Sequence, residues 1–396
     1  MADRKGKRRL SNITPNPPPV TRRSRRLMGQ SPNTPGEEEP PQPLRAASRE
    51  MSTISGLSAV STQPGQEPWA ELKQRAKARI TSYKPARRAN DDKLQDCLRC
   101  FIDILPADGQ ESIARDIADC QTDEDLWRVY HNLLTGLLLP IKAASRTPSV
   151  TLYPHTRRQR NADIVASTFP DESELRVERF RKACLERDSQ RCVISGVMDI
   201  EHWEKIGFPR DIESGHVEGA HIIPFSFGSW EGKTLPDDAG PKWEVLVRCF
   251  PAVRRLGMRP ETINDPCNGL TMFSPLHMEF GSFQMAFKET DTPHRYLLKT
   301  YRRFSTSLFK HIPQSPFVEL TSTTGDTARP SPVLLNCHFY LAEILNVSGM
   351  SEYIEEKIQD WESLKLAPGA GQLRADGSTD VSRYLQAGLW SLVSVS

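Results

Sequence analysis

The stretch VEGAHIIPFS, residues 217–226, decides how this sequence is interpreted. Its apolar residues are typical of a buried strand, and Pro224 is expected to end the regular pairing of that strand. His221 lies in the middle of these apolar side chains. An imidazole in such a place costs free energy unless another group binds it or hydrogen-bonds to it. The rest of the chain must therefore supply a partner for His221.

A second stretch, INDPCNGLTMFSPLHMEFGSFQMAF at 263–287, holds two more polar residues among apolar ones. Asn268 lies in a run of turn-forming residues, and His277 falls in a short helix that we expect to begin after Ser274. Alternating apolar residues from Phe283, and again in RYLLKTY, predict strands behind this helix. The sequence therefore places His221 on a strand, Asn268 in a turn and His277 on a helix.

Three pieces together resemble the HNH, or ββα-metal, nuclease domain of many fungal proteins: RDSQRCVISG, EGAHIIPFSFG and NDPCNGLTMFSPLHMEFGSF. The order His221, Asn268, His277 and the helical segments on both sides extend the resemblance over residues 90–365. It implies an α+β fold with a ββα-metal core of short strands. An N-terminal helical bundle and C-terminal helices would flank this core.

The resemblance also implies a role for each polar residue in hydrolysing a phosphodiester of DNA. His221 would be the general base, because a histidine with its ordinary pKa of about 6.5 suits proton transfer near neutral pH. Asn268 would orient it by hydrogen bonding. His277 would bind one divalent cation, Mg²⁺ being the expected ion, which stabilises the departing oxygen. Glu218 is the preferred second ligand, and His216 is the spare candidate.

One departure from the family pattern supports a different function. Many HNH motifs carry an acidic ligand directly before the base histidine, where this chain has Ala220. The core would then be a degenerate scaffold that binds nucleic acid or protein without cutting it. A third reading makes residues 66–145 a module that docks a partner protein. Cys97 and Cys100 form a single CxxC, which is more typical of a helix core than of a zinc site.

The chain divides by composition and periodicity into six parts. We expect a disordered basic, Pro-rich tail (1–65), a helical region (66–145), a linker (146–171), the HNH domain (172–310), a helical extension packed on it (311–365) and a flexible tail (366–396). Within them we expect a capping box of Thr122 and Asp125, a helix at about 172–188, a strand at 192–194, and helices at about 333–346 and 351–364.

Charge and cysteine usage indicate the compartment and the partners. Nine Lys or Arg among the first 30 residues favour an acidic partner such as DNA. The same clusters fit either a nuclear-import signal or a solvated tail. Eight scattered cysteines fit a reducing intracellular compartment, and no apolar run has the ~18 residues of a membrane span. Arg302, Arg303 and Arg210 are candidates for phosphate contacts, or equally parts of a solvated face.

Overall fold

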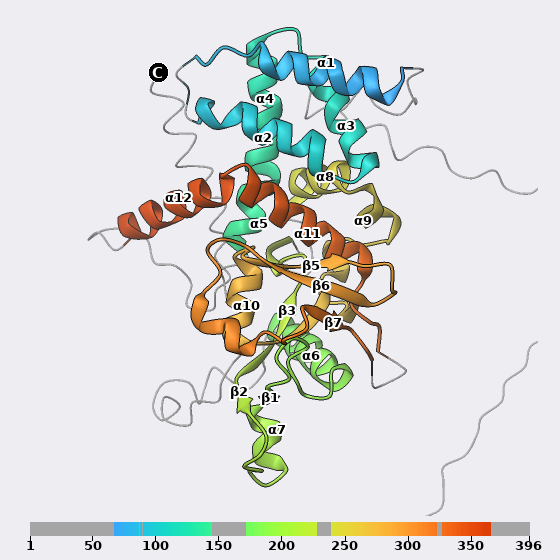
Figure 1. Cartoon of the computed structure of the whole chain (residues 1–396), viewed down its shortest axis with the longest axis vertical. Coiled ribbons are helices and arrows are strands. Elements are labelled where there is room, and N and C mark those ends of the chain that lie inside the picture. The colour runs from blue at the N-terminus through green and yellow to red at the C-terminus, as the bar shows by residue number, and fades with distance from the viewer. Residues whose placement is uncertain are drawn as a thin grey trace, which may run out of the picture. The chain divides into compact units, whose positions relative to one another are not determined.

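The computed structural model describes residues 67–86, 88, 90–144, 172–227, 239–322 and 327–365. The expected tails and linker therefore lie outside the described residues. Every described residue belongs to one compact unit, which lies within Val60–Ser396. This unit combines helices with three small sheets of two, two and three strands, an α+β arrangement (Figure 1).

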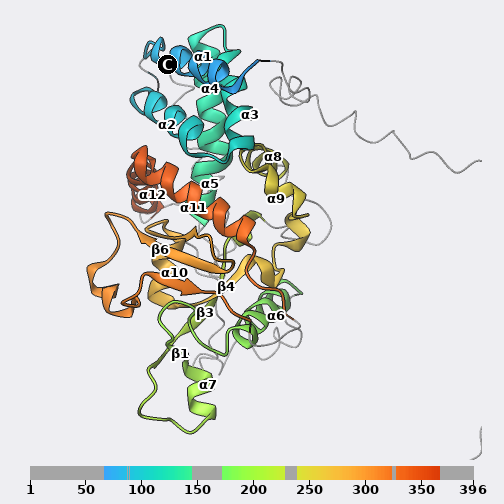
Figure 2. The ribbon, with the colours of Figure 1, turned by 45° about the vertical axis from the view of Figure 1, so that its right-hand side comes forward.

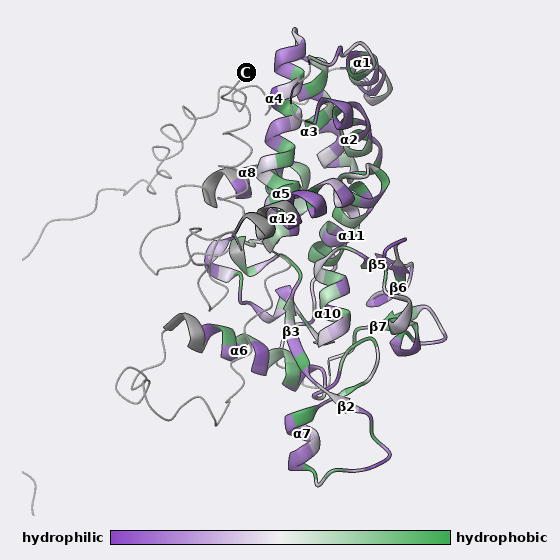
Figure 3. Ribbon diagram, turned by 90° about the vertical axis from the view of Figure 1, so that its left-hand side faces the viewer, coloured by the Kyte–Doolittle hydropathy of each residue, from purple (hydrophilic) through white to green (hydrophobic). Residues whose placement is uncertain are grey.

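Helices occupy the N-terminal part of this unit. They are α1 (Trp69–Thr81), α2 (Asp91–Ile104), α3 (Ala107–Ala118), α4 (Asp123–Leu133) and α5 (Leu139–Ala144), with a π-helical turn (Leu134–Leu138) between the last two. All of them fall within the helical region expected at 66–145. In Figure 3, α2 carries both hydrophilic and hydrophobic residues, as expected of a helix that buries one side. Helix α11 (Pro332–Val347) is more apolar and is buried over most of its length.

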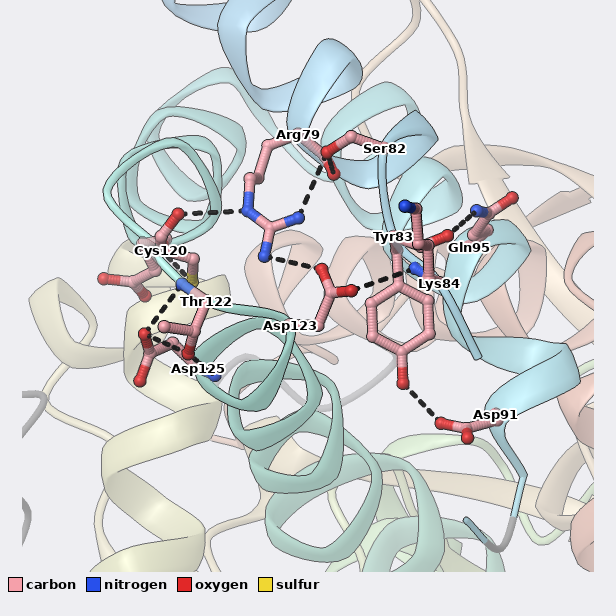
Figure 4. Close-up of polar contacts among 11 residues, drawn as sticks. Arg79, Ser82, Tyr83, Lys84, Asp91, Gln95, Cys120, Thr122, Asp123 and Asp125 are labelled. Carbon is pink, nitrogen blue, oxygen red and sulfur yellow. Dashed lines mark hydrogen bonds and ion pairs between the residues drawn. The ribbon is translucent and has the colours of Figure 1, made fainter. Parts of the chain in front are cut away.

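A polar network joins α1 to the start of α4 (Figure 4). Arg79 donates to the carbonyl of Cys120 and to Asp123, at 3.0 Å each. Thr122 and Asp125 form the predicted capping box. Cys97 and Cys100 are buried in the core, and burial raises the pKa of the Cys100 thiol to about 11. Both thiols are thus unreactive core residues, as the single CxxC motif suggested.

The central region contains short strands between helices. Its elements are α6 (Glu172–Arg187), β1 (Met198–Asp199), α7 (Ile200–Lys205), β2 (Ser214–Gly215), β3 (Val217–His221), β4 (Gly269–Phe273), α10 (Ser274–Gly281), β5 (Met285–Glu289), β6 (Arg295–Thr300) and β7 (Phe317–Glu319). The strand expected at 192–194 is wrong: these residues form a tight turn. Its bonds run from Gly196 N to Cys192 O and from Cys192 N to Val197 O, at 2.9 Å each. Gly196 permits the turn because its φ is +72°.

Further helices bring the N-terminal and central parts together. The helix α8 (Ala239–Cys249) packs on α3, and α9 (Pro251–Arg255) follows it. The closing helices α11 and α12 (Met350–Lys365) match the predicted ranges. α11 contacts both β5 and α2, and Figure 2 shows it between the N-terminal helices and the strands. One hydrophobic core therefore runs through both parts. None of the described helices is both long and apolar enough to cross a lipid bilayer.

Candidate active site

Two short antiparallel strands and the helix that directly follows them hold the candidate residues. The strands are β3 and β4, which a long connection (residues 222–268) joins, and we call this pair the hairpin. β3 and β4 pair antiparallel, with His221 opposite Gly269 and Val217 opposite Phe273. α10 then begins at Ser274, with proline in its first turn, where the missing N–H is tolerated. His221 ends β3, Asn268 immediately precedes β4, and His277 lies in the first turns of α10. The hairpin contacts α6 as well as α10.

The side of the hairpin that faces α6 is shaped by a glycine. A Cβ on Gly269 would lie 2.5 Å from Cys184 Sγ and 2.7 Å from ring carbons of Phe180, so a larger residue would push α6 away. The absence of that side chain lets Phe180 stack on the ring of His221, with centroids 3.9 Å apart and planes 10° apart. Phe180 therefore fixes the plane of the candidate base.

A hydrogen bond from Asn264, in the turn before β4, fixes the edge of the His221 ring. Nε2 of His221 lies 2.8 Å from Oδ1 of Asn264. Burial lowers the pKa of His221 to about 4; the Asn264 bond opposes this shift, and the charge of His277 adds to it. The imidazole is consequently neutral at pH 7, the state required of a proton acceptor.

Asn268 occupies a different position from the one that we expected. Its side chain is fully buried and donates to the carbonyls of Ile223 and Ile263, at 2.9 Å each, while its oxygen accepts from Ile223 N at 2.8 Å. The direct bond expected between Asn268 and His221 is made by Asn264 instead. Asn268 holds the residues just after His221 and just before Asn264, so it acts on the ring through the backbone.

His277 and Glu218 form a close pair on the other side of the hairpin. Nδ1 of His277 lies 2.5 Å from Oε2 of Glu218, and the Ser274 hydroxyl donates to Oε1 at 2.6 Å. Burial by itself would raise the pKa of Glu218, but the bonds from His277 and Ser274 outweigh it and the net shift is downward. Glu218 is therefore an anchored carboxylate.

The alternation of strand residues explains this division. Positions 218 and 221 differ by three, so their side chains leave opposite faces of β3. Glu218 accordingly meets α10, whereas His221 meets α6. His277 nevertheless affects the base, because its charge lowers the pKa of His221.

The donors at this site set limits on how a metal ion is held. Across the described ranges, no group of three or more His, Cys, Asp or Glu side chains is arranged to hold one. Both oxygens of Glu218 are already hydrogen-bonded. A histidine whose Nδ1 bonds a carboxylate presents Nε2 outward, which is the usual arrangement of a metal-binding histidine. A cation placed here would have Nε2 of His277 as its side-chain ligand among the described residues and would take its other ligands from water or substrate.

The other predicted site residues lie at the periphery. Arg302 and Arg303 are exposed in the turn after β6, and Arg210 is exposed between α7 and β2. Arg303 also lines a polar cleft of about 210 Å³ beside Glu279 and Lys142. In the described part of the chain, no hydrogen bond or ion pair joins these arginines to His221 or His277. His216 is exposed at the turn before β3, and its carbonyl accepts from Ser274 N at 2.9 Å.

Sequence reasoning missed one residue that organises the whole site. Arg187, at the end of α6, is fully buried. Its Nε and Nη2 donate to the two oxygens of the Asp188 carboxylate, at 2.7 Å each. It also donates to the carbonyls of Pro266, Gly269 and Ala328, at 2.8, 2.9 and 3.2 Å. This arginine thereby fastens α6 to the turn that carries Asn268. Arg187 is the first residue of the stretch RDSQRCVISG, and no local pattern in that stretch indicates a buried cation.

One comparison with known proteins found a match. Residues 192–288 match the model of a family described as HNH endonuclease. The chain carries an HNH nuclease-type domain. The matched segment contains β3, β4 and α10 with His221, Asn268 and His277, whereas Phe180 and Arg187 lie before it. No curated protein and no solved structure matched the chain.

Proposed function

We propose that this protein is a metal-dependent endonuclease that hydrolyses phosphodiester bonds of DNA at a ββα-metal site. The observation that carries the proposal is that the two histidines have different environments. His221 is held neutral by burial, and His277 is anchored by a carboxylate. A base and a cation-binding group are the two parts that hydrolysis of a phosphodiester requires.

Each residue then has a distinct task. His221 takes a proton from a water molecule, whose oxygen bonds to phosphorus while the bond to the leaving sugar oxygen breaks. Asn268 holds the backbone on either side of this base. His277 would hold a divalent cation, Mg²⁺ being the expected ion, through Nε2. A bound divalent cation supplies positive charge at the departing oxygen.

The contacts of Glu218 favour a role that differs from the one first expected. Its two oxygens are occupied by His277 and Ser274, so it orients the cation-binding imidazole more naturally than it binds the ion itself. Ala220 carries no acidic group, so the carboxylate that bonds to His277 comes from position 218.

The alternative function is a scaffold that binds nucleic acid without cutting it. It is favoured by Ala220 and by the small number of potential metal ligands around His277. The two proposals separate in a nicking assay on supercoiled plasmid with Mg²⁺ or Mn²⁺. An endonuclease nicks the plasmid, loses activity in EDTA, and keeps it in a His131→Gln control far from the hairpin. Binding without nicking in every metal tested supports the scaffold.

A further inference from the structure

The bond between Asn264 and His221 specifies where the proton of the neutral imidazole lies. The amide oxygen of Asn264 has no hydrogen to donate, so a bond to Nε2 at 2.8 Å requires the proton on Nε2. The lone pair of the neutral ring is then on Nδ1. No other described residue hydrogen-bonds to this ring.

The free nitrogen of His221 differs from that of a histidine buried in the core. His338 lies between the rings of Phe280 and Phe283, and its Nδ1 is buried without a hydrogen-bond partner. His221 is only half-buried, and its Nδ1 is not one of the buried nitrogens that lack a partner in the described part of the chain. Phe180 covers one face of the His221 ring and Phe225 lies near it at 37° between planes. The unbonded Nδ1 edge of this half-buried ring is therefore the part that water can reach.

The turn that carries Asn264 is itself fixed. Asn268 bonds to the carbonyl of Ile263, the residue before Asn264, and to both backbone groups of Ile223, two residues after His221. The two partners of the Nε2 bond are thus tied to one buried side chain. Such a bond is set by the fold and does not depend on substrate.

We propose that Asn264 is a positioning residue: it selects the Nε2–H tautomer of His221 and so makes Nδ1 the atom that receives the proton of the attacking water. The inference rests on the proposed nuclease function. In the step, one water O–H bond breaks and its proton goes to Nδ1. The water oxygen bonds to phosphorus, and the sugar oxygen leaves with the electron pair of the broken P–O bond.

The elements packed around His221 carry several charged or titratable groups. Arg181 and Cys184 lie on α6, His277 on α10, Glu218 on β3, and Asp265 next to Asn264. Of these, His277 is the group that shifts the pKa of His221, and it does so downward. An added carboxylate at position 264 would act in the opposite direction, because it stabilises the imidazolium.

The test uses the full chain labelled with ¹⁵N-histidine, and NMR correlation of ring nitrogens with ring protons identifies each tautomer. The His221 signal is assigned by its loss in His221→Gln. We expect the Nε2–H pattern in the natural chain and a mixture of tautomers in Asn264→Leu. Asn336→Leu, which removes another half-buried amide, should leave the pattern unchanged. An Nδ1–H pattern in the natural chain, or a pure Nε2–H pattern in Asn264→Leu, overturns the inference.

Cleavage kinetics provide the second readout. Asn264→Leu should lower the single-turnover rate by about 100-fold, as expected for a misplaced reacting group. Asn264→Asp, which is nearly isosteric, should move the rising limb of the pH–rate profile to higher pH by about one to two units. An unmoved profile in Asn264→Asp contradicts the role of Asn264. A natural chain that cuts no DNA but shows the Nε2–H tautomer contradicts the nuclease proposal and leaves the tautomer assignment intact.

Discussion

Glu218 and His277 lie 59 positions apart in sequence, yet Oε2 of the first is 2.5 Å from Nδ1 of the second. The contact forms because α10 crosses the face of the hairpin from which Glu218 projects. It orients an imidazole at the start of a helix, with its other nitrogen directed away from the carboxylate.

Replacing Glu218 by glutamine should weaken the binding of the divalent cation. The amide keeps the shape of the side chain but removes the charge that fixes the tautomer of His277. Loss of such a carboxylate typically lowers metal affinity by about 10- to 100-fold. Titration calorimetry with Mn²⁺ on Glu218→Gln and on the exposed control Glu261→Gln measures the effect. Equal affinities in the two variants would show that Glu218 does not act on the cation.

The stability of the protein should fall as the pH drops below about 6.5. The pKa of His221 is lowered to about 4 and that of His338 to about 3, both chiefly by burial. Between these values and the ordinary value of about 6.5, the unfolded chain binds more protons, so acidification favours unfolding by at most about 1.4 kcal/mol per pH unit for each group.

Urea unfolding at pH 7 and pH 5 measures this dependence. His221→Gln and His338→Gln should each show a smaller loss of unfolding free energy over this interval than the natural chain. The exposed His216→Gln serves as the control and should behave like the natural chain. A loss of stability that is the same in all four proteins would assign the pH dependence to other groups.

Removing the buried guanidinium of Arg187 should destabilise the hairpin region strongly. Arg187→Ala removes the cation bound to the buried Asp188 carboxylate and one donor from each of three carbonyls, and breaking a buried ion pair typically costs about 3–5 kcal/mol. Arg191→Ala, which removes a more exposed arginine bonded to Gly196 O, should cost less than about 1 kcal/mol. Denaturant unfolding of both variants gives the comparison, and equal costs would contradict the clamp described for Arg187.

The elements of the site follow from sequence more readily than its contacts. The helix that carries His277 is indicated by Ser274, Pro275 and the apolar residues after them, and the strand of His221 by its alternation and by Pro224. Glu218, expected as a second metal ligand, lies against His277, and its role as a ligand stays a prediction. The helix and the strand are local features, so pattern and residue type are sufficient to find them.

The partners of His221 depend on contacts that no local pattern specifies. Asn264 and Asn268 both lie in one turn, and only its three-dimensional course decides which amide meets the ring. Phe180 reaches His221 from a helix 41 positions earlier because Gly269 leaves space for it. Arg187 is an arginine in a polar segment, and its burial depends on carbonyls from three distant residues.

The fourth prediction addresses the central claim, that His221 and His277 act together on one phosphodiester. Plasmid nicking is measured in Mn²⁺ for the natural chain, His221→Ala, His277→Ala and the double variant, with Mn²⁺ affinity measured in parallel. The account predicts that both single variants lose nicking by about 100-fold or more, that the double variant is no worse, and that only changes at His277 weaken Mn²⁺ binding. Nicking that survives either substitution at the natural rate would contradict the account.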